Sequence, residues 1–87
     1  MAKFMVAVSN VSKVNGKEEI GDILRAWTYD DFSEARKQYG RVIAGLKRHK
    51  KIRYNVELPK KTFMAQTESD DDGKSLWITL TEEKEGA

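Results

Sequence analysis

Few residues in this sequence have the chemistry of a catalyst, and they form no recognisable catalytic pattern. The chain contains one histidine, His49, and no cysteine, so disulfide bonds, thiolate metal sites and cysteine catalysis are excluded. His49 lies within the cationic run Lys47–Lys51, where no neighbouring carboxylate stands ready to orient its ring. We therefore expect His49 to be a surface residue of a basic turn.

The serines and acidic residues have simpler explanations than catalysis or metal binding. No serine stands in a nucleophile elbow, and no glycine-rich phosphate loop is present. The run Asp70–Gly73 resembles part of a calcium-binding EF-hand loop, in which the sixth residue is glycine and the twelfth is a bidentate glutamate. If Gly73 is the sixth residue, the twelfth is Thr79, which cannot serve as that ligand. Such a run is typical of a solvated turn. The sequence predicts a protein that is not an enzyme and has no metal site, cofactor or small-molecule substrate.

Charge distribution is the most informative feature of the chain. The whole protein has a formal charge of +2, but residues 1–35 sum to −2, residues 36–65 to +9 and residues 66–87 to −5. A small domain with one strongly positive segment and a negative end is suited to a charged partner. The candidate partner- or phosphate-binding residues are Arg36, Lys37, Arg41, Lys47, Arg48, Lys50, Lys51, Arg53, Lys60 and Lys61.

Two classes of partner fit this pattern. In the first, the basic surface meets an acidic patch on a protein complex, with aromatic residues adding buried contacts. In the second, the same residues grip the DNA or RNA backbone with little sequence readout, since no nucleic-acid motif of defined spacing is present. Trp27 and Trp77 are the candidate aromatic contacts. Each alternates out of phase with apolar neighbours, so we expect at least one on a helix-free sheet face.

The first part of the chain has the pattern of a β-hairpin. Phe4, Val6 and Val8 alternate with smaller or polar residues, which is typical of a strand. Asn15-Gly16 is a strong signal for a type I′ turn, because both central residues of that turn need positive φ. The return strand should run from Lys17 to about Trp27, with a β-bulge near Gly21 where the alternation breaks.

A helix should follow, capped by Thr28 and opened by acidic residues that suit the helix dipole. Its apolar positions, at steps of three and four, are Phe32, Ala35, Tyr39, Val42, Ile43 and Leu46. Three strands then follow, at about 52–58, 62–67 and 76–81, with Pro59 ending the first. The predicted fold class is α+β, of order ββαβββ, an antiparallel sheet with one helix packed on one face.

The alternation also predicts which side chains form the core. The strand candidates are Phe4, Val6, Val8, Ile20, Leu24, Ile52, Tyr54, Val56, Leu58, Ile78 and Leu80, in addition to the apolar positions of the helix. The chain length predicts a single domain over residues 1–87, with 82–87 as a frayed tail. The apolar N-terminal stretch is too short for a signal peptide, and no segment approaches the ~20 apolar residues of a membrane span. We expect a cytoplasmic protein that does not bind membranes.

The turn Asn15-Gly16 and the helix start Thr28–Glu34 define a compact plan of two hairpins around one helix. This plan resembles that of the small α+β proteins that phages and mobile elements encode to block host machinery, anti-CRISPR proteins among them. The resemblance covers the topology of most of the chain and includes no functional motif. It implies a non-enzymatic regulator or inhibitor that binds a protein complex through the basic helix end and the adjacent strand.

Overall fold

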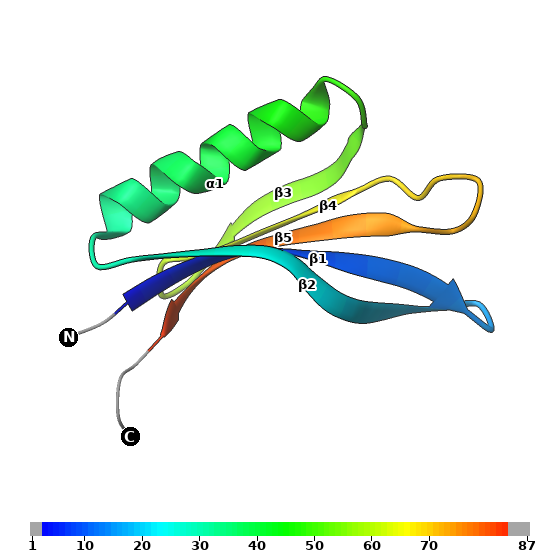
Figure 1. Ribbon diagram of the computed structural model, residues 1–87, viewed down its shortest axis with the longest axis horizontal. Helices are drawn as coiled ribbons and strands as arrows, with labels where there is room; N and C mark the ends of the chain where they lie inside the picture. The colour runs from blue at the N-terminus through cyan, green and yellow to red at the C-terminus, as the bar shows by residue number, and fades with distance from the viewer. Residues whose placement is uncertain (1–2, 84–87) are drawn as a thin grey trace.

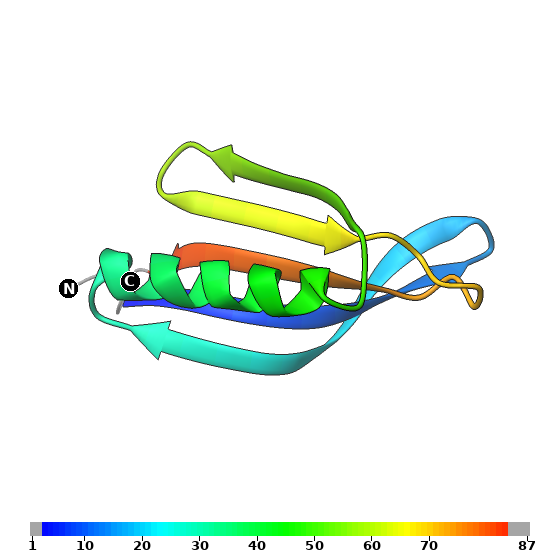
Figure 2. The ribbon, with the colours of Figure 1, turned by 90° about the horizontal axis from the view of Figure 1, so that it is seen from above.

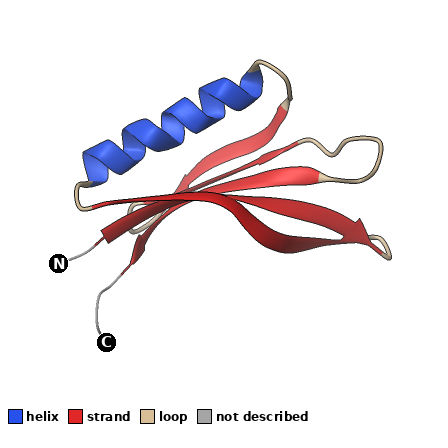
Figure 3. Ribbon diagram, viewed as in Figure 1, coloured by secondary structure: helices blue, strands red, loops and turns tan. Residues whose placement is uncertain are grey.

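The computed structural model describes residues 3–83 and confirms the α+β fold with the order ββαβββ. A single antiparallel sheet lies beneath one helix (Figures 1 and 3). The elements are β1 (Lys3–Val14), β2 (Lys17–Tyr29), α1 (Phe32–Lys47), β3 (Ile52–Leu58), β4 (Thr62–Thr67) and β5 (Ser75–Glu83).

The strand order across the sheet is β2-β1-β5-β4-β3, so β2 and β3 are the two edge strands. The chain leaves the sheet at one edge, crosses above it as α1, and returns at the other edge (Figure 2). Asn15 and Gly16 both have positive φ, 53° and 80°, as the predicted hairpin turn requires. The described residues contain no helix with the length and apolar character that crossing a bilayer demands.

The helix begins later than the sequence predicts. Thr28 and Tyr29 still pair with β1, opposite Met5 and Phe4, so Thr28 has strand geometry and is not the helix cap. Asp31 is the N-cap, and its Oδ1 accepts a hydrogen bond of 3.0 Å from the Ser33 backbone N–H. The strand ladder with β1 therefore overrides the Thr28 capping signal.

The predicted bulge at Gly21 is confirmed. Ser9 pairs with Ile23 and Val11 with Ile20, so Gly21 and Asp22 together face the single residue Asn10. The Asn10 side chain lies against the Gly21 backbone, in the space that a Cβ atom would occupy. A side chain at position 21 would therefore require the Asn10 side chain to move.

The core lies between α1 and the central strands. Eight of the seventeen predicted core residues are in its buried cluster, and four more, Phe32, Val42, Leu46 and Ile52, are partly buried against it. The buried cluster consists of Phe4, Val6, Val8, Ala35, Tyr39, Ile43, Phe63, Ala65, Ile78 and Leu80. Phe63 lies at its centre, stacked on Phe32 at 6.2 Å and tilted against Tyr39 at 5.5 Å between ring centroids. Phe63 and Ala65 of this cluster, and Ala7 and Val11 beside it, are buried residues that the predicted set did not include.

Four residues that the sequence predicts to be in the core are exposed. Ile20 and Leu24 of β2 are 56% and 54% exposed, and Val56 and Leu58 of β3 are 41% and 38% exposed. In β2 the residues that face the helix are Arg25 and Trp27. The two register shifts on either side of Ile23 cancel each other, so Ile20 lies on the helix-free face, and Leu24 is left unpaired.

In β3 the cause is one bulged residue. Ile52 pairs with Thr67 but Tyr54 pairs with Gln66, so Arg53 is an extra residue in the ladder. This residue reverses the alternation, because successive strand residues point to opposite faces. Ile52 packs on the core, whereas Tyr54, Val56 and Leu58 face away from the helix, and Tyr54 is half-buried there.

The end of the chain also differs from expectation. Strand β5 continues through Glu83, and Glu82 pairs with Phe4 of β1. Glu82 and Glu83 are therefore part of the sheet and not of a frayed tail, because β1 extends far enough to pair with them. The rest of the predicted tail, residues 84–87, lies outside the described residues.

A matched pair of leucine substitutions tests the reversed alternation of β3. Leu80→Ala should lower the free energy of unfolding by about 2–5 kcal/mol, because the side chain is fully buried. Leu58→Ala removes the same atoms from an exposed position and should cost about 1 kcal/mol or less. Urea unfolding of both variants measures the difference. Equal costs would contradict the bulge at Arg53.

Tyr39 joins α1 to the edge strand β3, and its titration should reveal this contact. Its hydroxyl donates a 2.7 Å hydrogen bond to Asn55 Oδ1, and burial raises the pKa of Tyr39 to about 12. The folded pKa is above the unfolded value, so the stability that this group contributes is complete below pH 10 and is lost as pH rises toward 12. Tyr39→Phe should cost about 1 kcal/mol at neutral pH.

Urea unfolding across this alkaline range checks the Tyr39 prediction. The fall in stability should be smaller in Tyr39→Phe than in the natural protein, because the variant has no phenol to ionise at this position. A Tyr39→Phe variant with an unchanged alkaline profile would show that the phenol contributes nothing to the pH dependence.

Candidate protein-binding groove

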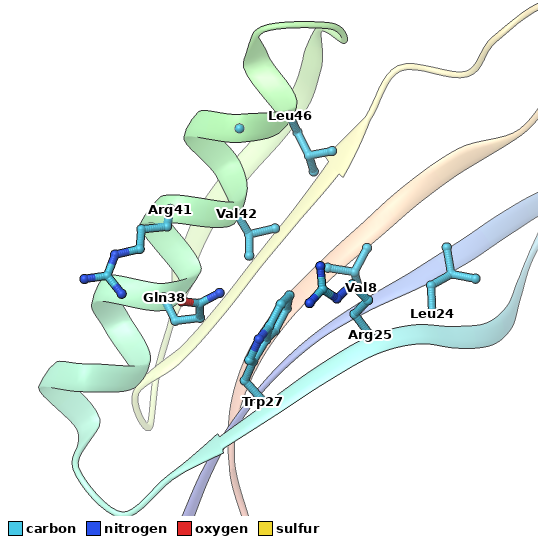
Figure 4. A pocket seen from close by; sticks show the side chains of 9 residues that line it. Val8, Leu24, Arg25, Trp27, Gln38, Arg41, Val42 and Leu46 are labelled. Carbon is cyan, nitrogen blue, oxygen red and sulfur yellow. The ribbon is translucent and has the colours of Figure 1, made fainter.

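A largely apolar hollow lies between α1 and the edge strand β2. It has a volume of about 390 Å³. Figure 4 shows its side chains, which come from one strand at the floor, the edge strand at one side and the helix at the other. The lining residues are Val8, Leu24, Arg25, Trp27, Gln38, Arg41, Val42, Gly45 and Leu46. We refer to this hollow as the α1–β2 groove.

Strand alternation and helix periodicity together bring these residues to one place. Arg25 and Trp27 are two residues apart on β2, so both point to the helix side of the sheet. On α1 the lining positions recur at steps of one, three and four, which places them on the side of the helix that faces β2. Val42 and Leu46 point toward the sheet, and Trp27 points toward the helix (Figure 4).

The two arginines add charge to an otherwise apolar groove. The Arg25 guanidinium lies over the Trp27 ring, 4.9 Å from its centroid. Arg41 rises from α1, on the opposite side of the groove. Within residues 3–83 neither arginine has an ion-pair partner. The groove therefore presents two guanidinium groups that a carboxylate can approach.

The α1–β2 groove is lined by apolar, amide and guanidinium side chains. Its lining contains no carboxylate, histidine or hydroxyl side chain, so it offers no general base and no nucleophile. Its floor and walls suit a branched or aromatic side chain, and its arginines suit a neighbouring carboxylate. No three of the described histidine and acidic side chains gather so as to hold a metal ion.

The ten basic residues predicted from the sequence do not form one surface. Arg36 and Lys61 lie over aromatic rings of the core: Arg36 is 4.6 Å from Phe63, and Lys61 is 5.3 Å from Phe32. Lys37 pairs with Glu34 at 3.9 Å. Lys60 lines a separate hollow beside Glu82. These four residues are thus divided among separate contacts.

The basic residues at the end of α1 form a second group. Lys47, Lys50 and Lys51 line a broad depression of about 610 Å³ that also includes Tyr54. Arg48 is the C-cap of the helix. Of the ten predicted residues, only Arg41 lines the α1–β2 groove.

An acidic loop adjoins the lysines of this helix end. The Glu68 backbone N–H donates to the Lys51 carbonyl at 2.9 Å, and Glu68 lines the same depression. Asp70 is also close: hydrogen bonds from the backbone N–H groups of Lys74 and Asp72, with a smaller contribution from the charge of Lys50, lower the pKa of its carboxyl. The negative end predicted from the sequence therefore offsets part of the positive charge at the helix end.

Arg53 forms an ion pair with Glu18 within the molecule. Its Nη1 lies 2.8 Å from Glu18 Oε1, and Gln66 Nε2 donates to the other Glu18 oxygen at 2.9 Å. These two hydrogen bonds, from Gln66 first and Arg53 second, lower the pKa of Glu18. The contacts join β2 to β4 and β3 across the helix-free face, so the sheet curls at this end.

The two tryptophans lie on opposite faces, which confirms that at least one is on the helix-free face. Trp77 lines a hollow of about 230 Å³ there, together with Ile20, Tyr54 and Met64. Trp27 lies in the α1–β2 groove. Sequence reasoning did not select Arg25 or Leu24 as site residues. The Arg25-x-Trp27 spacing was the available signal for Arg25, since it places both residues on one strand face.

No protein family, curated protein sequence or solved structure matches this chain.

The cation–π contact in the groove can be tested by fluorescence. In a Trp77→Phe background, Arg25→Ala should shift the Trp27 emission to longer wavelength, because the guanidinium no longer covers the ring. The loss of stability should be about 0.5–1 kcal/mol. Arg41→Ala in the same background is the matched control, and should leave the Trp27 emission unchanged. Identical spectra for both variants would argue against the Arg25–Trp27 contact.

Proposed function

We propose that this chain is a non-enzymatic binding protein, and that its α1–β2 groove captures a segment of a partner protein that has both apolar and acidic side chains. The observation that carries this proposal is the combination of the half-buried Trp27 with Arg25 and Arg41, two arginines with no ion-pair partner within residues 3–83, around an apolar hollow.

The composition of the groove supports a protein partner. Tryptophan and arginine are the residues most often found at interface hot spots, where truncation costs 2 kcal/mol or more. Leu24, at 54% exposure, extends the apolar surface from the groove toward solvent. An apolar partner side chain would gain from burial against Trp27 and Leu46, and a carboxylate beside it would gain from the two guanidinium groups.

A regulator or inhibitor of the phage type expected from the architecture would use such a groove to occupy a site on its target. The absence of acids, bases and nucleophiles from the groove lining supports binding over catalysis. A cytoplasmic location belongs to the same proposal, and rests on the cysteine-free composition.

A second candidate function is binding to a nucleic-acid backbone at the helix end. The observation that favours it is the depression lined by Lys47, Lys50 and Lys51, with Tyr54 beside them. Lysines can contact several phosphates there, and a tyrosine can stack on a base. The nearby Glu68 and Asp70 weaken this surface for a polyanion, which is why we place it second.

The test compares two charge reversals of equal size. Arg25→Glu with Arg41→Glu changes the groove, whereas Lys47→Glu with Lys50→Glu changes the helix end by the same charge. Each protein is used to select binders from a displayed library of random heptapeptides. Peptides selected by the natural protein should lose about tenfold or more in affinity for the groove variant, as expected when hot-spot arginines are removed, and keep it for the helix-end variant.

Nucleic-acid binding is measured in parallel. Fluorescence anisotropy of labelled DNA and RNA, single-stranded and duplex, is recorded at about 50 and 200 mM salt. A fall in affinity of about 10² or more with salt, together with loss in the helix-end variant, would establish the second candidate. Failure of the library to yield any peptide that depends on Arg25 and Arg41 would refute the groove proposal.

A further inference from the structure

The edge strand β2 has two halves that differ in their protection against pairing with another chain. Over Lys17–Leu24 it contains two register shifts and three acidic residues, Glu18, Glu19 and Asp22. Bulges and charges of this kind are how proteins block an exposed edge. Over Arg25–Tyr29 the ladder with β1 is regular, from Val8↔Arg25 to Phe4↔Tyr29, and contains no bulge and no proline.

The unprotected half of β2 lies directly beside the α1–β2 groove. Within residues 3–83, β2 pairs with β1 alone, so the backbone groups on its outer side are available along Arg25–Tyr29. Arg25 and Trp27, which line the groove, belong to this same segment. The structure therefore places free strand hydrogen-bonding groups and a side-chain groove next to each other.

The opposite edge of the sheet lacks this combination. Strand β3 is bulged at Arg53 and is followed by Pro59, which has no backbone N–H. The Arg53 side chain is bound to Glu18 across the helix-free face. Tyr54–Leu58 of β3 also has a regular ladder, but the apolar groove with its two arginines lies beside β2.

We propose that the partner segment is an extended acidic peptide that pairs with Arg25–Tyr29 as a sixth strand of the sheet. This inference rests on the proposed function and specifies how the groove is used. A strand added to β2 lies about 4.8 Å beyond it, and its alternate side chains point to the helix side. There they meet Arg25, Trp27 and Arg41, so residues two apart in the peptide face the groove.

The charge and apolar character of the groove predict the amino-acid composition of the peptide. The groove offers two unpaired guanidinium groups and an apolar floor, so the side chains on the helix side should include Asp or Glu and a branched or aromatic residue two positions away. The side chains in between face the helix-free side, next to Ala26 and Thr28, where small or β-branched residues fit. A basic peptide would be rejected by both arginines.

The experiment uses the heptapeptide of highest affinity from the selection described above, with acetylated and amidated ends. A series of variants carries one backbone N-methyl group each, at successive positions. In a strand, alternate N–H groups point to the neighbouring strand, so methylation at alternate positions should reduce affinity about tenfold or more and methylation at the others should not. Hydrogen exchange should slow at alternate amides of residues 25–29 when this peptide is added.

The outcomes separate this inference from the proposed function. If the peptide depends on Arg25 and Arg41 but tolerates every N-methyl group equally, the groove binds side chains and strand addition is wrong. If no selected peptide depends on the two arginines, both proposals fail. If the outward-facing amides of Arg25–Tyr29 are protected without peptide and sedimentation shows a dimer, a second copy of this chain occupies the edge, and the peptide proposal is overturned.

Discussion

The width of the single helix is the constraint on which the rest of the structure depends. An α-helix with its side chains is about 10 Å across, whereas the outer strands of a five-stranded sheet lie about 19 Å apart. Phe63 fixes α1 above the sheet through Phe32 and Tyr39, and the Tyr39 hydroxyl ties it to β3. A hollow therefore opens on the β2 side, and the entire opposite face of the sheet has no helix to cover it.

Three register shifts, two in β2 and one in β3, then decide which side chains occupy the covered and uncovered faces. A bulge shifts the pairing of a strand by one residue. Each such shift moves the following side chains to the opposite face of the sheet. In β2 the two shifts cancel, and Ile20 lies on the open face, whereas the single shift at Arg53 sends Val56 and Leu58 there. The bulge at Arg53 also lets its side chain reach Glu18, so a local irregularity of β3 helps to curl the sheet.

The sequence predicts those features that depend on neighbours in the chain. The strand order along the chain, the turn at Asn15-Gly16 and the bulge at Gly21 follow from local patterns, and all are present. The face of β3 could not be predicted, because Arg53 has no glycine or broken alternation to mark its bulge. The groove could not be predicted either, since it joins residues of β2 and α1 that only the packing of the helix brings together.

The same packing decides which basic side chains have contacts within the molecule and which remain for a partner. Several cations of the basic segment are used within the molecule, over Phe63 and Phe32 or beside Glu18 and Glu34, where they screen aromatic rings and acidic groups. Arg41 and Arg25 have no such partner in the described chain, and they line opposite sides of the same apolar hollow. A carboxylate bound in that hollow would be partly shielded from water. Its binding should therefore depend on salt less steeply than the binding of a polyanion to exposed lysines, because counterion release contributes less.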